Sequence, residues 1–325
     1  MSGLEGSGPY QASARTAWDL GPADRSQPAG RVLALVLDGY LRTFRDHEPG
    51  VRADIDPEEL HDFRVALRRS RSLLSAGRSV FPPDELELLE SLSAWMASVT
   101  GPVRDLDVLM TDLGPLSRRL ADELAAGVDP LRAELAERRS EAFASLVEVL
   151  DGNRYQVLLR RWQRMASVYR IGGGEAGPDA ANVAGPVVDS LILASHDRVR
   201  HRAERAMKHD ERDAWHSLRK GLKRFRYLVA SFAPLYPEGS FDEVGRRLSK
   251  LQDKLGRLQD HHVQATLMES VGMEVGGRAA LAAGALADAL HRDAEEAHRR
   301  CRRAWTHFDT PAVRDQLHEV LHDRS

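Results

Sequence analysis

The segment His61-Asp62-Phe63-Arg64-Val65-Ala66-Leu67-Arg68-Arg69-Ser70-Arg71 returns 155 residues later as His216-Ser217-Leu218-Arg219-Lys220-Gly221-Leu222-Lys223-Arg224-Phe225-Arg226. Every His, Arg and Lys of the first copy meets a His, Arg or Lys in the second. The same shift aligns Phe81-Pro82 with Tyr236-Pro237, Gly101 with Gly256 and Asp105 with Asp260, so about fifty residues match without a gap. An ungapped match of this length indicates an internal duplication.

Each copy predicts a helix whose cations share one stripe. At about 100° per residue, side chains spaced by three and four residues lie on one face of a helix. This spacing occurs at His61, Arg64, Arg68 and Arg71, and again at His216, Arg219, Lys223 and Arg226. Apolar residues occupy a neighbouring stripe that can face a core. We therefore expect two matched basic helices, with Arg69, Lys220 and Arg224 beside the rows.

A solvated helix surface is the ordinary alternative for such cations. The chain carries 49 acidic residues against 46 Lys and Arg, so many of its cations can form ion pairs. A merely solvated face, however, gives no reason for the same cation spacing and the same His to occur twice. The repetition favours a binding role for the two rows.

Composition narrows the class of protein. A formal net charge of −3 argues against a general binder of nucleic acid or membranes, so any anion site must be local. The single cysteine, Cys301, excludes an intramolecular disulfide and fits a reducing cytosol. The N-terminus lacks the pattern of a signal peptide, and no apolar stretch approaches the ~20 residues that span a bilayer. We expect a soluble, cytoplasmic protein.

The pattern along the chain predicts an all-α fold. Residues 1–29 are rich in Gly, Ser, Ala and Pro and are predicted to be a disordered tail. Helical periodicity follows, without strand-like alternation, and a Gly-rich linker over 171–183 separates the repeats. We expect two pseudo-symmetric antiparallel four-helix bundles from an internal duplication, over 30–170 and 184–325, with a basic cavity between or along them.

Local signals predict where several helices begin and end. Asp56 is the expected N-cap of the first basic helix, with Pro57 at its first position and Glu59 at its third. Gly101-Pro102 is expected to break or kink the next helix. A further helix is expected over 115–126, and a capping box at Ser240 with Glu243.

Four motifs resemble those of the CHAD family, which is named for an α-helical domain with a characteristic histidine. They are the segments 56–69, 101–108, 216–227 and 255–260, in the family's order and spacing, and the resemblance covers roughly residues 30–325. It implies a pair of four-helix bundles around a basic cavity that binds inorganic polyphosphate, sometimes at polyphosphate granules. Family members are often fused to a triphosphate-tunnel (CYTH) domain, and this sequence is expected to be a stand-alone member. Gln259 stands where the family tends to carry Asn.

The basic rows suit the ligand that the resemblance implies. Polyphosphate is a linear polyanion without bases, and Arg offers it bidentate contacts while Lys offers point charges. The expected contacts are His61, Arg64, Arg68, Arg69, Arg71, His216, Arg219, Lys220, Lys223, Arg224 and Arg226. Asp105 and Asp260 are expected to orient these side chains from behind, with an N-cap or surface role as the alternative. Arg104 is a weaker candidate for the same task, because Gln259 occupies its equivalent position.

No catalytic residue, metal site or cofactor is expected. His318-Glu319-Val320-Leu321-His322 matches the zinc-peptidase pattern but is followed by only three residues, so a downstream third ligand is missing. His61 and His216 lie among Arg residues that would repel a metal ion.

Two other functions remain open. One is a phosphohydrolase or phosphotransferase acting on polyphosphate, with His61 or His216 as phosphoacceptor, although the acidic metal cluster usual for phosphoryl transfer is absent from the sequence pattern. The other is a helical scaffold that binds an acidic protein or nucleic acid. The pattern does not separate polyphosphate from other polyanions, and it leaves the oligomeric state open.

Overall fold

All the long elements that the structure describes are helices. The computed structural model describes residues 20–168 and 176–322, and within these ranges it contains no strand beyond an isolated bridge between Pro28 and Val183. The first half contains η1 (Pro22–Ser26), α1 (Ala29–Ala53), α2 (Pro57–Ala76), α3 (Pro83–Ser117), α4 (Asp122–Ala125), α5 (Val128–Asp151) and α6 (Asn153–Val168). The second contains α7 (Ala184–His209), α8 (Arg212–Phe232), η2 (Ala233–Leu235), α9 (Asp242–Val275), α10 (Gly277–Phe308) and α11 (Pro311–His322). The predicted all-α class is confirmed.

The long helices follow the same order in both halves. In each half a helix precedes the basic helix, which is α2 in the first half and α8 in the second. The longest helices come next, α3 and α9, followed by α5 and α10, and each half closes with a shorter helix. This order is what a duplication predicts. The superposition of the two halves remains a prediction.

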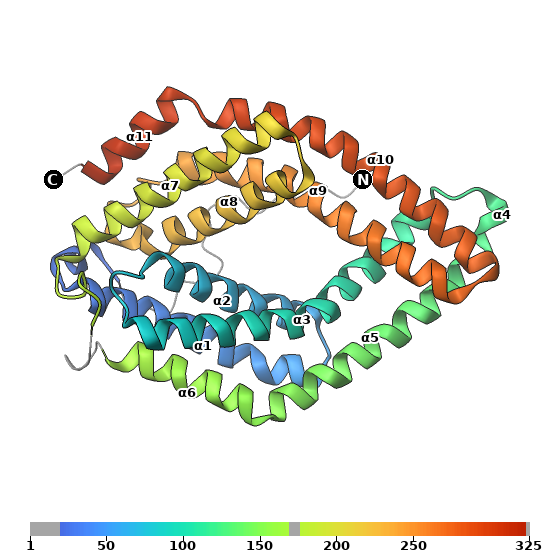
Figure 1. Cartoon of the computed structure of the whole chain (residues 1–325), viewed down its shortest axis with the longest axis horizontal. Coiled ribbons are helices and arrows are strands. Elements are labelled where there is room, and N and C mark those ends of the chain that lie inside the picture. The colour runs from blue at the N-terminus through green and yellow to red at the C-terminus, as the bar shows by residue number, and fades with distance from the viewer. Residues whose placement is uncertain (1–19, 169–175, 323–325) are drawn as a thin grey trace.

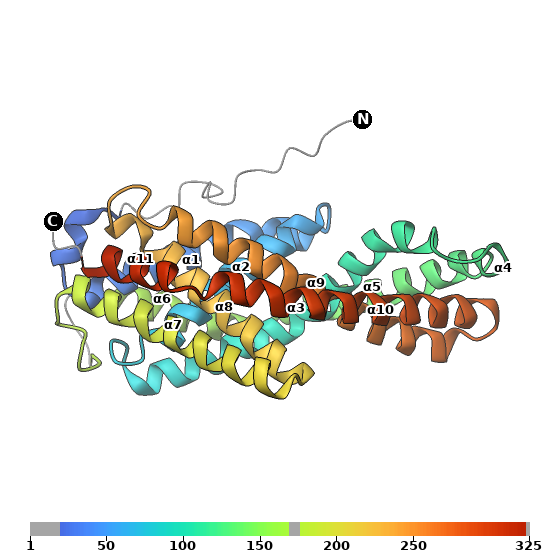
Figure 2. The same cartoon turned by 90° about the horizontal axis from the view of Figure 1, so that it is seen from above.

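The two halves lie along the two long sides of an elongated molecule. Figure 1 shows α1, α2, α3 and α6 on one side and α7, α8, α10 and α11 on the other. At one end, the C-terminal part of α3 and the helices α4 and α5 lie beside the turn between α9 and α10, and Figure 2 shows that this end projects from the rest. No helix in the described part of the chain is long and apolar enough to span a bilayer.

Both hydrophobic cores contain residues of both halves. In the larger core, the Phe44 ring stacks on Phe63 with 3.7 Å between ring centroids and packs against Trp162 at 5.2 Å. The same core continues through Phe225 and Phe232 of α8. Aromatic residues bury large apolar areas, so they dominate the stability of such a core. The predicted boundary between the halves is therefore the point at which the order of helices begins to repeat. The two halves share their hydrophobic cores.

The smaller core closes the projecting end. Leu109 and Leu113 of α3 and Leu131 of α5 pack there with Met268 of α9 and Leu286 of α10. Between the two cores, the basic rows of α2 and α8 interrupt the apolar interior. The halves are therefore held together at two places, with a space between them.

The start of α2 follows the prediction at Asp56 and Pro57. Asp56 Oδ1 accepts a hydrogen bond of 2.9 Å from the Glu58 amide, and Pro57 is the first helical residue. Glu59 does not complete a capping box, because its carboxylate contacts His47 Nδ1 at 2.8 Å.

Three other boundary predictions were wrong. Helix α3 is not broken at Pro102 and ends only at Ser117, because apolar residues on both sides of Pro102 are buried in the two cores and keep the chain helical. A kink at Pro102 remains a prediction. The helix expected over 115–126 is reduced to the single turn of α4. Helix α9 begins at Asp242 without a side-chain cap, and Glu243 pairs with Arg246 and Arg247 instead of closing a capping box.

The predicted tail and linker are partly structured. Residues 1–19 and 169–175 lie outside the described residues. Arg25, inside the predicted tail, pairs with Asp189 of α7 at 2.9 Å and lies over the Tyr236 ring. In the linker, the amide of Gly177 donates to Val80 O at 3.0 Å and that of Asp179 to Ser79 O at 2.8 Å. Long-range contacts that composition does not reveal hold both segments.

Replacing Asp56 with Ala should lower the free energy of unfolding by about 1 kcal/mol, because the first turn of α2 loses its cap. Chemical denaturation measures this change. Glu87→Ala, at an exposed position of α3, is the matched control and should leave stability within about 0.5 kcal/mol. Equal losses in both variants would mean that Asp56 does not cap the helix.

Candidate functional site

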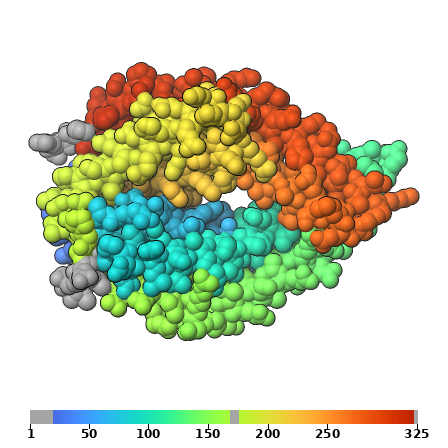
Figure 3. All heavy atoms as spheres, viewed as in Figure 1, coloured from blue at the N-terminus to red at the C-terminus, as the bar shows by residue number. Residues whose placement is uncertain are grey.

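An opening passes through the middle of the molecule. Figure 3 shows it between the teal helices of the first half and the gold and orange helices of the second. Helices α2 and α3 border one side, and α8 and α9 border the other (Figure 1). We call this space, bordered by these four helices, the central opening. Both predicted basic helices lie on its border.

The two basic rows face one another across the central opening. Arg68 of α2 lies close enough to Arg219 and Lys223 of α8 for its charge to lower the pKa of both side chains, in addition to the larger effect of burial. Farther along, the charge of Arg224, which lies beside the second row, lowers the pKa of Arg71, again after the larger effect of burial. The tertiary structure thus brings together cations that lie far apart in the chain.

Arg64 is held by neutral partners. Its Nη1 donates to Thr100 Oγ1 at 2.7 Å and to Ala97 O at 3.2 Å, both on α3. Burial, with a smaller contribution from the charge of Arg68, lowers its pKa to about 10, and Asp105 opposes this change. A hydroxyl and a carbonyl fix the guanidinium in place without neutralising its charge, so the charge stays available to an anion.

The predicted carboxylates lie next to the rows. Asp260 Oδ1 is 3.3 Å from Arg219 Nη2, and the Arg219 side chain is only 16% exposed. Asp105 is an exposed residue. Neighbouring protein atoms nevertheless remove part of the water around its carboxylate, and this desolvation raises its pKa. Arg64 lowers that pKa and Asp260 raises it. Each half therefore places one acid near its first row arginine, and the two acids are near enough to repel each other.

Lys223 carries the most perturbed charge of the rows. Burial, together with the neighbouring cations Arg219 and Arg68, lowers its pKa to about 7. Asp260 opposes them but does not restore the usual value. A lysine in this setting is protonated more readily when an anion arrives, because the anion offsets the repulsion.

Several arginines of the two basic helices have an Nε donor without an acceptor. The Nε atoms of Arg68, Arg69 and Arg219 are buried and form no hydrogen bond within the described residues. A buried donor without a partner costs about 1–3 kcal/mol. Phosphate oxygens are suitable acceptors for such donors.

The other predicted cations of the two basic helices differ in position. Arg69 of α2 and Arg226 of α8 lie against the ring of Tyr227, at 5.9 and 5.6 Å from its centroid, which sequence reasoning missed. An aromatic face attracts cations, so Tyr227 joins the two basic helices. Lys220 and Arg224 are exposed.

A further arginine was also missed by the sequence analysis. Arg202 of α7 lies near Arg224, whose charge lowers its pKa after the larger effect of burial. A Cβ atom at Gly221 would come within 2.6 Å of Arg202 Nη1, so the glycine makes room for this guanidinium. The spacing pattern of the basic helices does not include α7, which is why the repeat could not reveal Arg202.

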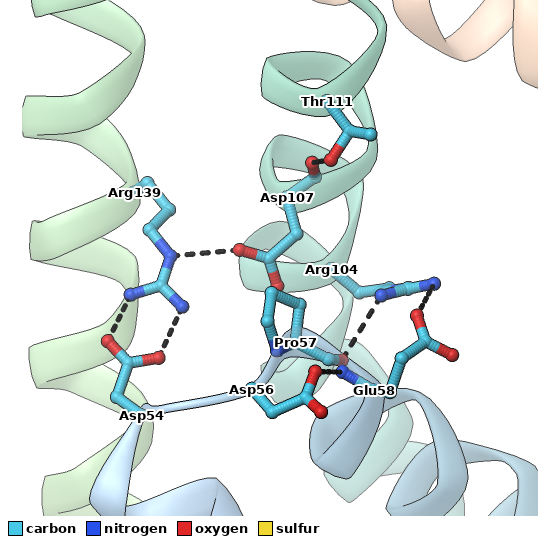
Figure 4. Close-up of polar contacts among 8 residues, drawn as sticks. All are labelled: Asp54, Asp56, Pro57, Glu58, Arg104, Asp107, Thr111 and Arg139. Atoms are coloured by element: carbon cyan, nitrogen blue, oxygen red, sulfur yellow. Dashed lines mark hydrogen bonds and ion pairs between the residues drawn. The ribbon is translucent and has the colours of Figure 1, made fainter.

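Ion pairs near the start of α2 secure the frame of the site (Figure 4). Arg104 Nη1 donates to Pro57 O at 3.1 Å and its Nη2 is 3.2 Å from Glu58. Arg139 of α5 pairs with Asp54 and, at 2.9 Å, with the buried Asp107 of α3. Arg104 therefore binds the start of α2, and Asp107, which the sequence analysis did not single out, ties α3 to α5.

The two repeated histidines lie near cationic side chains. Burial lowers the pKa of His61, and Arg104 lowers it further. Burial also lowers the pKa of His216, whose Nδ1 is 2.5 Å from Gln259 Oε1. Residues 20–168 and 176–322 contain no group of three or more His, Cys, Asp or Glu that could hold a metal ion. Both imidazoles are suited to hydrogen bonding within a cationic site.

A family model and two curated relatives match the sequence. The CHAD domain model matches residues 35–269. The uncharacterized proteins MT2285 and Rv2226 of Mycobacterium tuberculosis are each 27% identical to the chain over 261 residues, which is 74% of this chain and 44% of each relative. The chain thus spans less than half the length of these two relatives.

Two solved structures share the fold. The crystal structure of the CHAD domain from the plant Ricinus communis matches with a TM-score of 0.67 at 24% identity, covering 94% of this chain and 95% of that one. PptA from Streptomyces chartreusis matches with a TM-score of 0.66 at 19% identity, covering 86% and 100%. Likeness at these identities establishes the arrangement of helices.

The buried charge of Lys223 should make stability depend on pH. The folded pKa is about 7 and the usual value is 10.5, so below pH 7 the charged ammonium is buried at a cost that fades as pH rises from 7 to 10.5. Lys223→Met should therefore stabilise the protein more at pH 6 than at pH 9.5 in chemical denaturation.

Lys220→Met is the control for this measurement, because Lys220 is exposed one turn away. Its effect on stability should be the same at both pH values. A Lys223→Met effect that does not change with pH would show that Lys223 has an ordinary pKa.

Proposed function

The chain belongs to the CHAD family, and from this we propose that it binds inorganic polyphosphate in the central opening without chemical turnover. The observation that carries the proposal is the pair of basic rows that face one another with little acid between them. Arg64, Arg68, Arg219 and Lys223 come from both copies of the repeat, and two acids accompany them. Association with polyphosphate granules would follow from the same binding.

A linear polyanion suits this arrangement better than a compact anion. Cations one helical turn apart along α2 and α8 form a line on each side of the opening. Orthophosphate engages one or two cations at a time, whereas a chain engages several cations of both rows together. The expected preference is therefore for long chains.

Binding without catalysis is the simpler function for these residues. Asp105 and Asp260 lie near the rows, and each lies beside an arginine whose positive charge opposes the binding of a metal ion. Phosphoryl transfer commonly uses metal ions that bridge the phosphate oxygens. His61 and His216 supply hydrogen bonds in this proposal and accept no phosphoryl group.

Reversing two charges should test the site directly. The variant Arg68→Glu with Lys223→Glu should weaken binding of long-chain polyphosphate at least tenfold, about 1.4 kcal/mol. The plot of log affinity against log salt should become shallower by about 0.7 for each phosphate that the variant no longer neutralises. Titration at several salt concentrations, with circular dichroism to verify helicity, measures both changes.

The matched control is Arg132→Glu with Arg160→Glu, which changes the net charge equally at exposed positions of α5 and α6. It should bind nearly as wild type does. If the two double variants are equally impaired, attraction is diffuse and the central opening is not the site. Competition with ATP, RNA and orthophosphate tests the ligand, and stronger binding of RNA than of polyphosphate would contradict the proposal.

Purified protein should release no orthophosphate from polyphosphate with or without Mg²⁺, because binding alone is proposed. A phosphate-release assay over hours measures this. Steady release that is abolished by His61→Ala or His216→Ala, with helicity retained, would establish the enzymatic alternative.

A further inference from the structure

A second set of cations lines a groove between α9 and α10. Figure 2 shows these two helices side by side. Two adjoining hollows lie between them, and Lys254 lines both. We call them together the outer groove; its basic residues are Arg247, Lys250, Lys254, Arg257 and His261 of α9 and Arg300, Arg303 and His307 of α10.

The cations of the outer groove form two facing rows. Those of α9 are spaced by three and four residues, as are those of α10, so each set lies on one helix face. Because the two helices are antiparallel neighbours, Lys250 and Lys254 of α9 line the groove together with Arg303 and Arg300 of α10. At 3.6 residues per turn, Lys254 lies about 120° around α9 from Asp260. The outer groove is therefore on a different face of α9 from the central opening.

Acids neutralise only part of this groove. Glu296 pairs with Arg300, Glu243 pairs with Arg247, and Asp293 is engaged by Arg119. Within the described ranges, no carboxylate forms an ion pair with Lys250, Lys254, Arg257 or Arg303. Four cations without an ion-pair partner among the described residues repel each other along one groove, although one carboxylate, that of Glu243, is near enough to act on Lys250. An anion between the cations would relieve that repulsion.

The floor of the outer groove leaves room for a ligand. Ala297 and Ala304 of α10 line it, and the buried Cys301 lies between them in the sequence. Burial raises the pKa of the Cys301 thiol to about 12, and the charges of Lys254 and Arg257 oppose this rise. These two cations therefore lie near enough to the floor of the groove for their charges to act on the buried thiol.

The outer groove is absent from the repeated pattern. In the alignment of the two repeats, which are 155 residues apart, the residues equivalent to Arg247, Lys250 and Lys254 are Leu92, Trp95 and Val99 of α3. Those three residues belong to or pack against the larger core. The first half thus uses this helix face for packing, while the second half exposes it as a basic groove.

We propose that the outer groove is a second, separate site for a polyphosphate chain. The identity of the ligand rests on the proposed function, whereas the place of the site rests on the facing rows of α9 and α10. A single long chain that engages both sites would be held more tightly than by either site alone.

Titration calorimetry with tripolyphosphate at low salt tests the number of sites. Wild type should bind at two sites. Lys254→Glu with Arg303→Glu should remove one of them, Arg68→Glu with Lys223→Glu should remove the other, and the four changes together should abolish binding. The control Arg132→Glu with Arg160→Glu should keep both.

A second variant of the outer groove distinguishes loss of the site from misfolding of the first variant. Lys250→Glu with Arg257→Glu changes two exposed residues of the same row and should also remove one site with helicity unchanged. The outer groove is refuted if wild type binds at one site only, if groove variants bind as wild type does, or if RNA but not tripolyphosphate occupies the groove. Loss of binding in groove variants alone would uphold the outer groove and refute the central opening.

Discussion

Repulsion between Arg68 and the two cations Arg219 and Lys223 must be overcome before the halves of the molecule can close around the central opening. Apolar burial in the two hydrophobic cores offsets this repulsion, because each core contains residues from both halves. The buried hydrogen bond of 2.5 Å between Tyr40 of α1 and Ser231 of α8 adds a polar contact between the halves. Apolar burial outside the opening thus stabilises a cationic interior that would not hold together by itself.

The position of the carboxylates distinguishes arginines that stabilise the fold from arginines that are available to bind an anion. Arg104 and Arg139 are paired with carboxylates and fasten the start of α2 and the side of α3. Arg64 and Arg68, both within α2, have neutral partners or buried donors without acceptors among the described residues. Arginines around the same helix therefore have different tasks, and the tertiary position of the acids decides which.

Helix α9 differs from α3, its counterpart in the sequence repeat, in the residues of one helix face. One of its faces carries Asp260 at the central opening, a second packs in the core, and a third carries the cations of the outer groove. The matching face of α3 is apolar and packs inward. The proposed site in the central opening thus uses a face that α3 and α9 have in common. The proposed site in the outer groove uses a face that is basic only in α9.

The sequence by itself determined the helical class, the two basic rows and the cap at Asp56, because each depends on residues within a few turns of one another. It also pointed to Asp105 and Asp260 through the repeat. Only the tertiary structure decided that the rows face each other, that Tyr227 and Arg202 join them, and that Arg139 binds Asp107. It also decided that α3 continues through Pro102, that Glu243 pairs with arginines and closes no cap, and that Arg25 packs against Tyr236. These features depend on side chains far apart in the chain, whose approach is set by burial in the shared cores and not by local periodicity.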